Sequence, residues 1–330
     1  MTSMGYKPCL ADPDLWLKAE VRADGVAYYS YILNYVDDIL VIHENPRPVL
    51  DKIDKYMKLK PDSVGDPDVY LGAKLKRVQI DNGVWCWSLS PSKYIQESVR
   101  NCENHLKDNF DGKYSFTKNA PNPFPLGYDP DMDTTPELDP EAASYYNSII
   151  GMMRWMVELG RVDINTEVSQ LSSFLAMSRM GHLEAAIHVM SYLKIKHNSR
   201  LVLNPTYAAI NYDGFKQDED WTAFYQDAKE AMPPNAPKPL GKEVELRGFV
   251  DSDHAGDKRT RRSRTGFLIF MNMSLINWIS KKQSTVEGAV FGAEFVAMKQ
   301  LIETLRGIRY KLRMMGIEVT GPSYIYGDNM

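Results

Sequence analysis

The last third of the chain has an element order that restricts its fold. Three alternating apolar stretches, at residues 246–251, 266–271 and 275–279, have the period of β-strands, and a fourth strand pattern follows at 323–326. Between the third and fourth stretches lies a long helical pattern with large apolar residues at helix spacing. This expected stripe consists of Phe291, Phe295, Met298, Ile302, Leu305 and Leu312. If the last strand pairs in parallel with the first, the crossover is right-handed and both strands end on the same side of the sheet.

Three acidic residues occupy the positions at which these elements would converge. Asp251 ends the first strand, Asp328 follows the last strand, and Glu294 borders the apolar stripe of the helix. Open α/β sheets place their sites at the carboxyl ends of strands. Three carboxylates there would hold two Mg²⁺ ions, with Mn²⁺ as the alternative cofactor, about 4 Å apart for attack of water on a phosphodiester. Each acid alone is explained as a turn residue or a solvated helix residue, but in this order the three predict a catalytic metal site.

Basic residues are concentrated near these acids. The chain carries a net charge of −4, yet from residue 242 onward it has 14 Lys and Arg against 10 Asp and Glu. Because local potential steers a polyanion, this region predicts contacts with nucleic-acid phosphates. The residues concerned are Lys258, Arg259, Arg261, Arg262, Arg264, Lys281 and Lys282. The alternative that remains open is a solvated hairpin loop.

A second acidic feature lies near the start of the chain. Residues 28–42 form two β-rich apolar runs that flank Asp37 and Asp38, which predicts a strand, a turn and a second strand. Two adjacent carboxylates at the edge of an apolar core repel each other. A bound Mg²⁺ would remove this repulsion, because Mg²⁺ prefers carboxylate oxygens. The alternative is a plain hairpin turn, in which Asp is a favoured residue.

The rest of the chain predicts a mixed α+β and α/β protein. A polar helix is expected at residues 47–59, strands at 69–78 and 84–89, and a helix from 92 to about 104. The expected regions are a β-rich part at 1–107, a Pro-, Asp- and Asn-rich loop at 108–142, a helical part at 143–203, a Pro-containing linker at 204–244 and the mixed sheet at 245–330.

Several short strings of residues follow one another in the order of a known family. Tyr35-Val36-Asp37-Asp38 is similar to the Tyr-x-Asp-Asp motif of reverse transcriptases. Further strings are Tyr70-Leu71-Gly72-Ala73-Lys74-Leu75, Leu89-Ser90-Pro91-Ser92-Lys93-Tyr94, Tyr146-Asn147-Ser148-Ile149-Ile150-Gly151, Val250-Asp251-Ser252-Asp253-His254-Ala255-Gly256-Asp257 and Ser280-Lys281-Lys282-Gln283. Together they resemble the Pol polyproteins of copia-type long-terminal-repeat retrotransposons.

This resemblance implies a fold and two activities. It implies a partial reverse-transcriptase palm and primer-grip region at 1–107, a helical thumb or connection at 143–203 and a truncated ribonuclease H domain at 245–330. RNA-directed DNA synthesis would use Asp37 and Asp38, and degradation of RNA in RNA–DNA hybrids would use the three acids named above. Both activities of the family depend on Mg²⁺ and act on a template-primer or an RNA–DNA hybrid.

The sequence departs from the family in two places. A palm active site needs a third metal-binding Asp from an earlier strand, and the 36 residues before Asp37 are too few to supply it. The family also continues past the position of Asp328 with another strand, helices and a further metal or proton-transfer residue. We therefore expect a fragment that does not polymerise alone and has weak or no nuclease activity. A non-catalytic remnant that at most binds nucleic acid is the alternative; an integrase-like nuclease is disfavoured by the Tyr35–Asp38 motif.

The cysteines and the apolar content indicate the environment. Cys9, Cys86 and Cys102 are scattered and have no metal-binding spacing, which predicts a reducing compartment. The resemblance implies an intracellular location, in a cytoplasmic particle and/or the nucleus. No stretch approaches the ~20 apolar residues of a transmembrane helix, so no membrane partner is expected. The oligomeric state is left open by the sequence.

Overall fold

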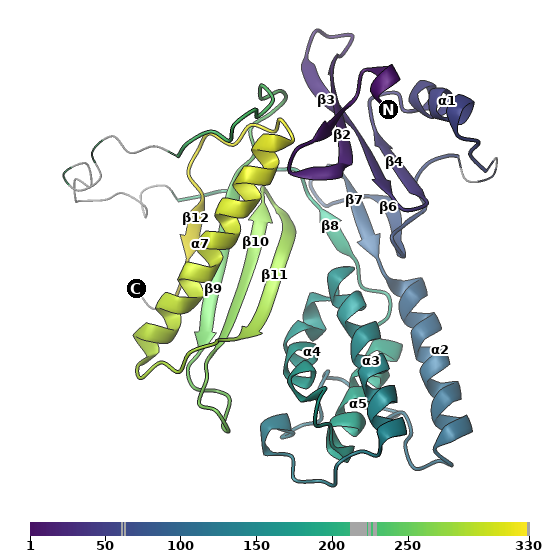
Figure 1. Cartoon of the computed structure of the whole chain (residues 1–330), viewed down its shortest axis with the longest axis vertical. Coiled ribbons are helices and arrows are strands. Elements are labelled where there is room, and N and C mark those ends of the chain that lie inside the picture. Colours follow the sequence, from purple (N-terminus) through teal and green to yellow (C-terminus); the bar gives the residue numbers. More distant parts are fainter. Residues whose placement is uncertain (61, 63, 212–222, 224–225, 227–229, 329–330) are drawn as a thin grey trace.

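The computed structural model describes residues 1–330 except 61, 63, 212–222, 224–225, 227–229 and 329–330. In the described part, the chain is a mixed α and β protein with three four-stranded sheets and a group of helices (Figure 1). The strand orders are β1-β2-β3-β4, β5-β6-β7-β8 and β11-β10-β9-β12. The predicted mixture of helices and sheets is therefore confirmed.

The first sheet is an antiparallel meander. Its strands are β1 (Lys7–Cys9), β2 (Asp12–Val21), β3 (Ala27–Tyr35) and β4 (Asp38–Ile42). β3 and β4 form the predicted hairpin, in which Tyr35 pairs with Asp38. A short 3-10 turn (Thr2–Met4) precedes the sheet, and helix α1 (Arg47–Tyr56) packs on it. α1 ends before the expected Leu59, because the Asp54 carboxylate accepts the backbone N–H of Leu59 at 2.9 Å and turns the chain.

The second sheet corrects one expectation and joins distant parts of the chain. Its strands are β5 (Val69–Tyr70), β6 (Ala73–Gln79), β7 (Trp85–Ser90) and β8 (Leu201–Leu203). The single strand expected at 69–78 is wrong, because Leu71 and Gly72 both have positive φ and turn the chain into a hairpin. β8 follows the helical region yet pairs with β7. The helices are therefore inserted between two neighbouring strands of one sheet.

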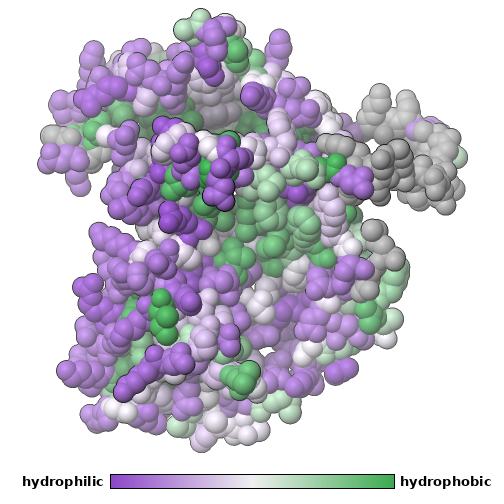
Figure 2. All heavy atoms as spheres, turned by 180° about the vertical axis from the view of Figure 1, so that it is seen from behind, coloured by the Kyte–Doolittle hydropathy of each residue, from purple (hydrophilic) through white to green (hydrophobic). Residues whose placement is uncertain are grey.

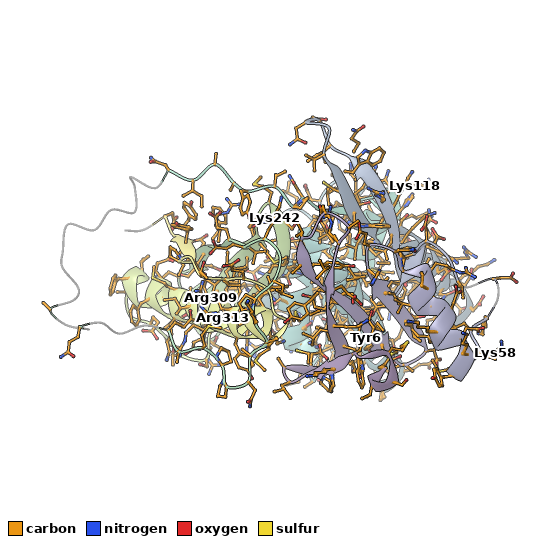
Figure 3. All side chains as sticks on the ribbon, turned by 90° about the horizontal axis from the view of Figure 1, so that it is seen from above. Tyr6, Lys58, Lys118, Lys242, Arg309 and Arg313 are labelled. Carbon is orange, nitrogen blue, oxygen red and sulfur yellow. The ribbon has the colours of Figure 1, made fainter. Side chains whose placement is uncertain are left out.

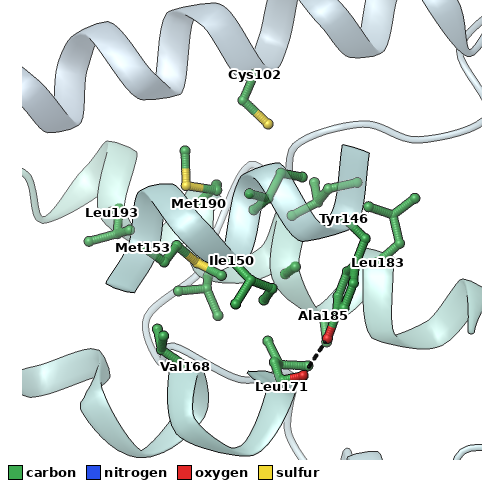
Figure 4. Packing of buried hydrophobic residues seen from close by; sticks show 14 of the residues in the cluster. Cys102, Tyr146, Ile150, Met153, Val168, Leu171, Leu183, Ala185, Met190 and Leu193 are labelled. Atoms are coloured by element: carbon green, nitrogen blue, oxygen red, sulfur yellow. Dashed lines mark hydrogen bonds between the residues drawn. The ribbon is translucent and has the colours of Figure 1, made fainter. Parts of the chain in front are cut away.

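The helical region has its own apolar core (Figure 4). Its helices are α2 (Ser92–Asn109), α3 (Pro140–Glu158), α4 (Asn165–Leu171) and α5 (Met180–Ile195), with 3-10 turns at Pro130–Met132, Val162–Ile164 and Ser172–Phe174. The apolar positions Ile149, Met153 and Met156, expected at helix spacing, are buried. The Tyr146 hydroxyl donates to the Leu171 carbonyl at 2.8 Å and satisfies the one polar atom of this large buried ring.

Two polar groups are buried at the edges of this helical core. Arg161 is 1% exposed and donates to both carboxylate oxygens of Asp163, at 2.8 and 2.6 Å. His182 lies 3.0 Å through Nε2 from the Pro130 carbonyl, and its Nδ1 accepts the backbone N–H of Arg179 at 3.1 Å. A carbonyl only accepts, so Nε2 carries the proton. His182 thereby fixes the irregular segment at 108–142 to α5.

The third sheet has the predicted element order. It consists of β9 (Leu246–Asp253), β10 (Arg264–Met271), β11 (Ser274–Lys282) and β12 (Tyr324–Tyr326), with α7 (Val290–Met314) between β11 and β12. β12 pairs in parallel with β9, as the crossover argument assumed, and β10 pairs antiparallel with both β9 and β11. α7 lies across one face of this sheet (Figure 1).

The buried stripe of α7 differs from the expected one. Phe291 and Phe295 are 78% and 60% exposed, and Ile302 is also exposed. The residues that pack on the sheet are Ala293, Ala297, Leu301, Leu305 and Leu312. The small alanines let the helix approach the strands closely, so the larger side chains next to them point outward.

Contacts from the first sheet and from Glu230 hold the C-terminal part of α7. The Cys9 thiol donates to the Met314 carbonyl at 3.4 Å, and the Tyr31 hydroxyl donates to the Met315 carbonyl at 2.9 Å, so the first sheet packs on the end of α7. Arg309 and Arg313 of α7 (Figure 3) both bind the Glu230 carboxylate, with N–O distances of 2.9 and 2.8 Å. Glu230 belongs to the expected linker at 204–244, of which residues 212–222, 224–225 and 227–229 lie outside the described residues. None of the described helices is long and apolar enough to cross a membrane.

Candidate metal centre and nucleic-acid contacts

The structure brings Asp251, Glu294 and Asp328 together. One carboxylate oxygen from each residue lies within 4.8 Å of the other two. Asp251 and Asp328 are exposed, and Glu294 is half-buried. Among the described residues, this is the one group of three His, Cys, Asp or Glu side chains arranged to share a metal ion.

The parallel pairing of β9 and β12 explains why the two aspartates meet. Phe249 pairs with Tyr326, so Asp251 and Asp328 each follow this pair by two residues and lie at the same end of the sheet. β9 itself continues to Asp253, two residues further than expected. Side chains two residues apart on a strand point to the same face, so Asp251 lies on the same face of β9 as Phe249.

Glu294 reaches the aspartates because α7 lies close to the sheet. Ala293 and Ala297 are fully buried against the strands. Gly248 of β9 has no side chain at the point where Leu301 packs, which allows the close approach. The first turns of α7 therefore bring the Glu294 backbone near the carboxyl end of β9.

The three carboxylates fit a hard divalent cation. Without a cation, three acids at this separation repel one another. Mg²⁺ binds carboxylate oxygens at about 2.0–2.1 Å, and its water ligands would occupy the exposed side. The residue types and their spacing therefore match a site for Mg²⁺ or Mn²⁺.

A cleft begins beside this acid cluster. Its volume is about 710 Å³, and it lies between the third sheet and the helical region, with Asn165, Thr166 and Gln170 on the helical side. On the sheet side, the rings of Phe249 and Tyr326 stack with centroids 4.8 Å apart. This is the face opposite α7, and seen from behind, apolar side chains gather over the third sheet (Figure 2). A cleft open to solvent thus leads to the carboxylates.

Asp37 and Asp38 stand apart from this cluster. Both are exposed at the turn between β3 and β4, where Val36 has a φ of 50°. Burial, and then the negative charge of Asp38 and two other nearby acids, raise the pKa of Tyr70. No third carboxylate among the described residues joins Asp37 and Asp38 as a metal ligand.

The structure divides the predicted phosphate-binding residues into two groups. Lys258 forms an ion pair with Asp129 at 2.7 Å, Lys282 pairs with Asp257, and Arg264 donates to the Ser169 hydroxyl at 2.7 Å. Burial lowers the pKa of Arg264. The remaining residues, Arg259, Arg261, Arg262 and Lys281, are exposed. Three of the predicted cations thus make contacts inside the protein, two of them with the helical part or the segment before it.

The acids opposite this basic loop were not anticipated from the sequence. Asp129 and Asp131 line a small cavity of about 190 Å³ together with Asp257, Arg264 and other residues of the third sheet. Burial, and next the charge of Asp257, raise the pKa of Asp131. Asp129 is more than 120 positions before Lys258, and no local pattern indicates that such distant segments meet.

Comparisons with known proteins agree with the motifs. The chain is 25% identical over 333 aligned positions to the retrovirus-related Pol polyprotein from transposon RE1 of Arabidopsis thaliana, which covers 100% of the chain and 19% of that protein. It is 23% identical to the corresponding polyprotein from transposon TNT 1-94 of Nicotiana tabacum, over 96% of the chain and 20% of that protein. The chain is a homologue of retrotransposon Pol polyproteins.

This Pol homologue spans about a fifth of the length of those polyproteins. An uncharacterized mitochondrial protein of Arabidopsis thaliana is 24% identical to it over 81% of the chain, and there the match covers 90% of the relative. No family model and no solved structure matches the chain.

Proposed function

We propose that this Pol homologue binds RNA–DNA hybrids and hydrolyses their RNA strand at Asp251, Glu294 and Asp328. The convergence of these three carboxylates from two parallel strands and the crossover helix carries the proposal. The similarity to Pol polyproteins supports it, as does the open cleft that leads to the acids.

Two groups of residues would have different roles in this reaction. Asp251, Glu294 and Asp328 would hold the metal ions, and bound Mg²⁺ supplies an activated water and stabilisation of the leaving oxygen. Arg259, Arg261 and Arg262 lie on the loop that joins β9 to β10, at the same end of the sheet as Asp251. Their exposed charges would bind phosphates of the hybrid and orient its backbone over the acids.

We propose that the β3–β4 hairpin does not support polymerisation in this chain by itself. Asp37 and Asp38 offer two carboxylates, but among the described residues no third acid completes a metal site. Template-dependent extension of a primer by the purified chain would refute this statement.

Cleavage of a labelled RNA–DNA hybrid in Mg²⁺ tests the proposed nuclease. We expect Asp251→Asn, Glu294→Gln and Asp328→Asn each to abolish cleavage. Glu303→Gln is the matched control, because Glu303 is an exposed acid on α7 that pairs with Lys299 outside the cluster. It should cleave like the wild type.

Two outcomes would contradict the proposal. Cleavage that survives the Glu294→Gln substitution would place the activity elsewhere or in a contaminant. Hybrid binding without cleavage by the folded wild-type chain, in either Mg²⁺ or Mn²⁺, would favour the non-catalytic, nucleic-acid-binding alternative.

A further inference from the structure

Gln283 is a buried amide at the junction of three elements near the acid cluster. It directly follows β11, and its side chain is 1% exposed. Its Nε2 donates to the Ala293 carbonyl at 2.9 Å and to the Thr265 hydroxyl at 3.2 Å. Because a carbonyl only accepts, the bond to Ala293 also fixes which end of the amide faces α7.

Both partners of this amide lie near the acid cluster, one on the helix and one on the sheet. Ala293 immediately precedes Glu294 in the second turn of α7. Thr265 lies on β10 beside Gly266, which pairs with Asp251. The Gln283 side chain therefore links the helix backbone next to Glu294 to β10, the strand that pairs with Asp251.

The Glu294 carboxylate depends on this backbone for its position. Within the described part of the chain, no hydrogen bond or ion pair holds that carboxylate itself, whereas Asp251 accepts the Ser252 backbone N–H at 2.8 Å. The direction of the Glu294 side chain is thus set by its rotamer and by the path of α7. A small rotation or shift of the first turns would move Glu294 away from the two aspartates.

The need to fill the buried space does not explain why residue 283 is a glutamine. Gln283 Oε1 is buried and has no hydrogen-bond partner among the described residues. A buried unpaired polar atom costs about 1–3 kcal/mol, which an apolar side chain of similar size would avoid. The bonds that Nε2 makes are therefore the physical reason for a glutamine here.

We propose that Gln283 is a positioning residue of the metal centre, which holds Glu294 within reach of Asp251 and Asp328. This role rests on the proposed function of the three acids. Residues that orient metal ligands typically change metal affinity by about 10- to 100-fold when they are removed. Gln283 should act in this range although it does not contact the metal.

Binding of Mn²⁺ to the full chain, followed by electron paramagnetic resonance, tests the proposal without reference to activity. Gln283→Met keeps the length and volume of the side chain but removes both donated bonds. We expect its Mn²⁺ dissociation constant to rise about 10- to 100-fold. Thr265→Val removes only the weaker partner, so its effect should be smaller and in the same direction.

Asn272→Gly is the matched control for loss of a buried amide. Asn272 lies in the β10–β11 turn at the opposite end of the sheet, donates to the Pro205 carbonyl at 3.0 Å and accepts the Glu245 backbone N–H at 3.0 Å. Its φ of 53° suits glycine. This variant also loses the hydrogen bonds of a buried amide, yet it should bind Mn²⁺ like the wild type.

The possible results separate this role from the proposed function. If the wild type binds Mn²⁺ and Glu294→Gln does not, but Gln283→Met and Thr265→Val bind it equally well, the positioning role is wrong and the nuclease proposal stands. If Asn272→Gly weakens Mn²⁺ binding as much as Gln283→Met, the effect is general destabilisation and the role is also wrong. If the wild type binds no Mn²⁺ at the acids, both proposals fall together.

Discussion

The close approach of α7 to the third sheet predicts whether a larger residue at position 248 stabilises or destabilises the fold. An alanine at position 248 would place its methyl group 2.7 Å from both Cδ atoms of Leu301 and 3.1 Å from its Cγ. The two shorter distances are at least 0.7 Å below the 3.4 Å at which ordinary contact begins. Leu301 is fully buried among the residues of the sheet core. We therefore expect Gly248→Ala to push α7 away from β9.

The expected magnitude follows from opposing effects. Without a clash, replacing a strand glycine by alanine would stabilise the fold by about 0.4–1 kcal/mol, because the unfolded chain loses conformational freedom. Overpacking of a filled core costs about 1–3 kcal/mol. We expect overpacking to dominate, so the net cost should reach up to about 2.6 kcal/mol and amide protection in β9 and α7 should fall by up to about 70-fold, at 1.4 kcal/mol per factor of ten.

Native-state hydrogen exchange resolved by segment is the appropriate assay, because a chain with several cores does not unfold in one step. Gly266→Ala on the neighbouring strand is the control, since the nearest atom to its methyl group would be the Asp251 carbonyl oxygen at 3.9 Å. Leu301→Ala should be far less harmful in the Gly248→Ala background than alone. Unchanged or increased protection in Gly248→Ala would refute the argument that helix packing requires glycine here.

Three further predictions concern polar contacts. Burial lowers the pKa of His182, so its neutral form is favoured in the fold. The contribution of His182 to the free energy of unfolding should be constant above pH 6.5, the ordinary pKa of histidine. It should fall as the pH decreases from there through the lowered pKa. This slope, measured by urea unfolding at a series of pH values, should be absent in His182→Asn. Asp163→Asn leaves the buried Arg161 charge without its carboxylate, and should destabilise the helical region by about 1–3 kcal/mol in urea unfolding followed by circular dichroism. Asp129→Asn releases Lys258, and fluorescence anisotropy should then show tighter hybrid binding at low salt and no difference at high salt.

The elements of the third sheet were predictable because local and topological rules agree there. Alternating strands and a long helix predicted the elements, and the pairing of β12 with β9, which the sequence analysis assumed, brings Asp251 and Asp328 to one end of the sheet. The hairpin around Asp37 was predictable for a similar reason, because two apolar runs flank an acidic turn. Short-range pattern determines the neighbours in the hairpin, whereas the pairing of β12 with β9 joins distant strands.

Other features depend on distant contacts that no local pattern encodes. Large residues such as Phe291 dominate the apolar spacing of α7, yet Ala293 and Ala297 make the buried face because Gly248 leaves room beneath the helix. The pairing of Asp129 with Lys258 depends on how the helical region and the third sheet meet. The sequence predicted that Asp251, Glu294 and Asp328 converge, but not the contacts that neutralise the charges nearby.

The parallel pairing of β9 with β12 also affects the order in which a newly made chain can fold. β9, β10 and β11 are consecutive, joined by residues 254–263 and by residues 272–273, so this meander can form as soon as it leaves the ribosome. The edge beside β9 stays open until α7 and β12 have been synthesised, and during that interval its unpaired backbone groups are available to other chains. Asp328 emerges after Asp251 and Glu294, so addition of the last strand covers the exposed edge and completes the acid cluster in the same step.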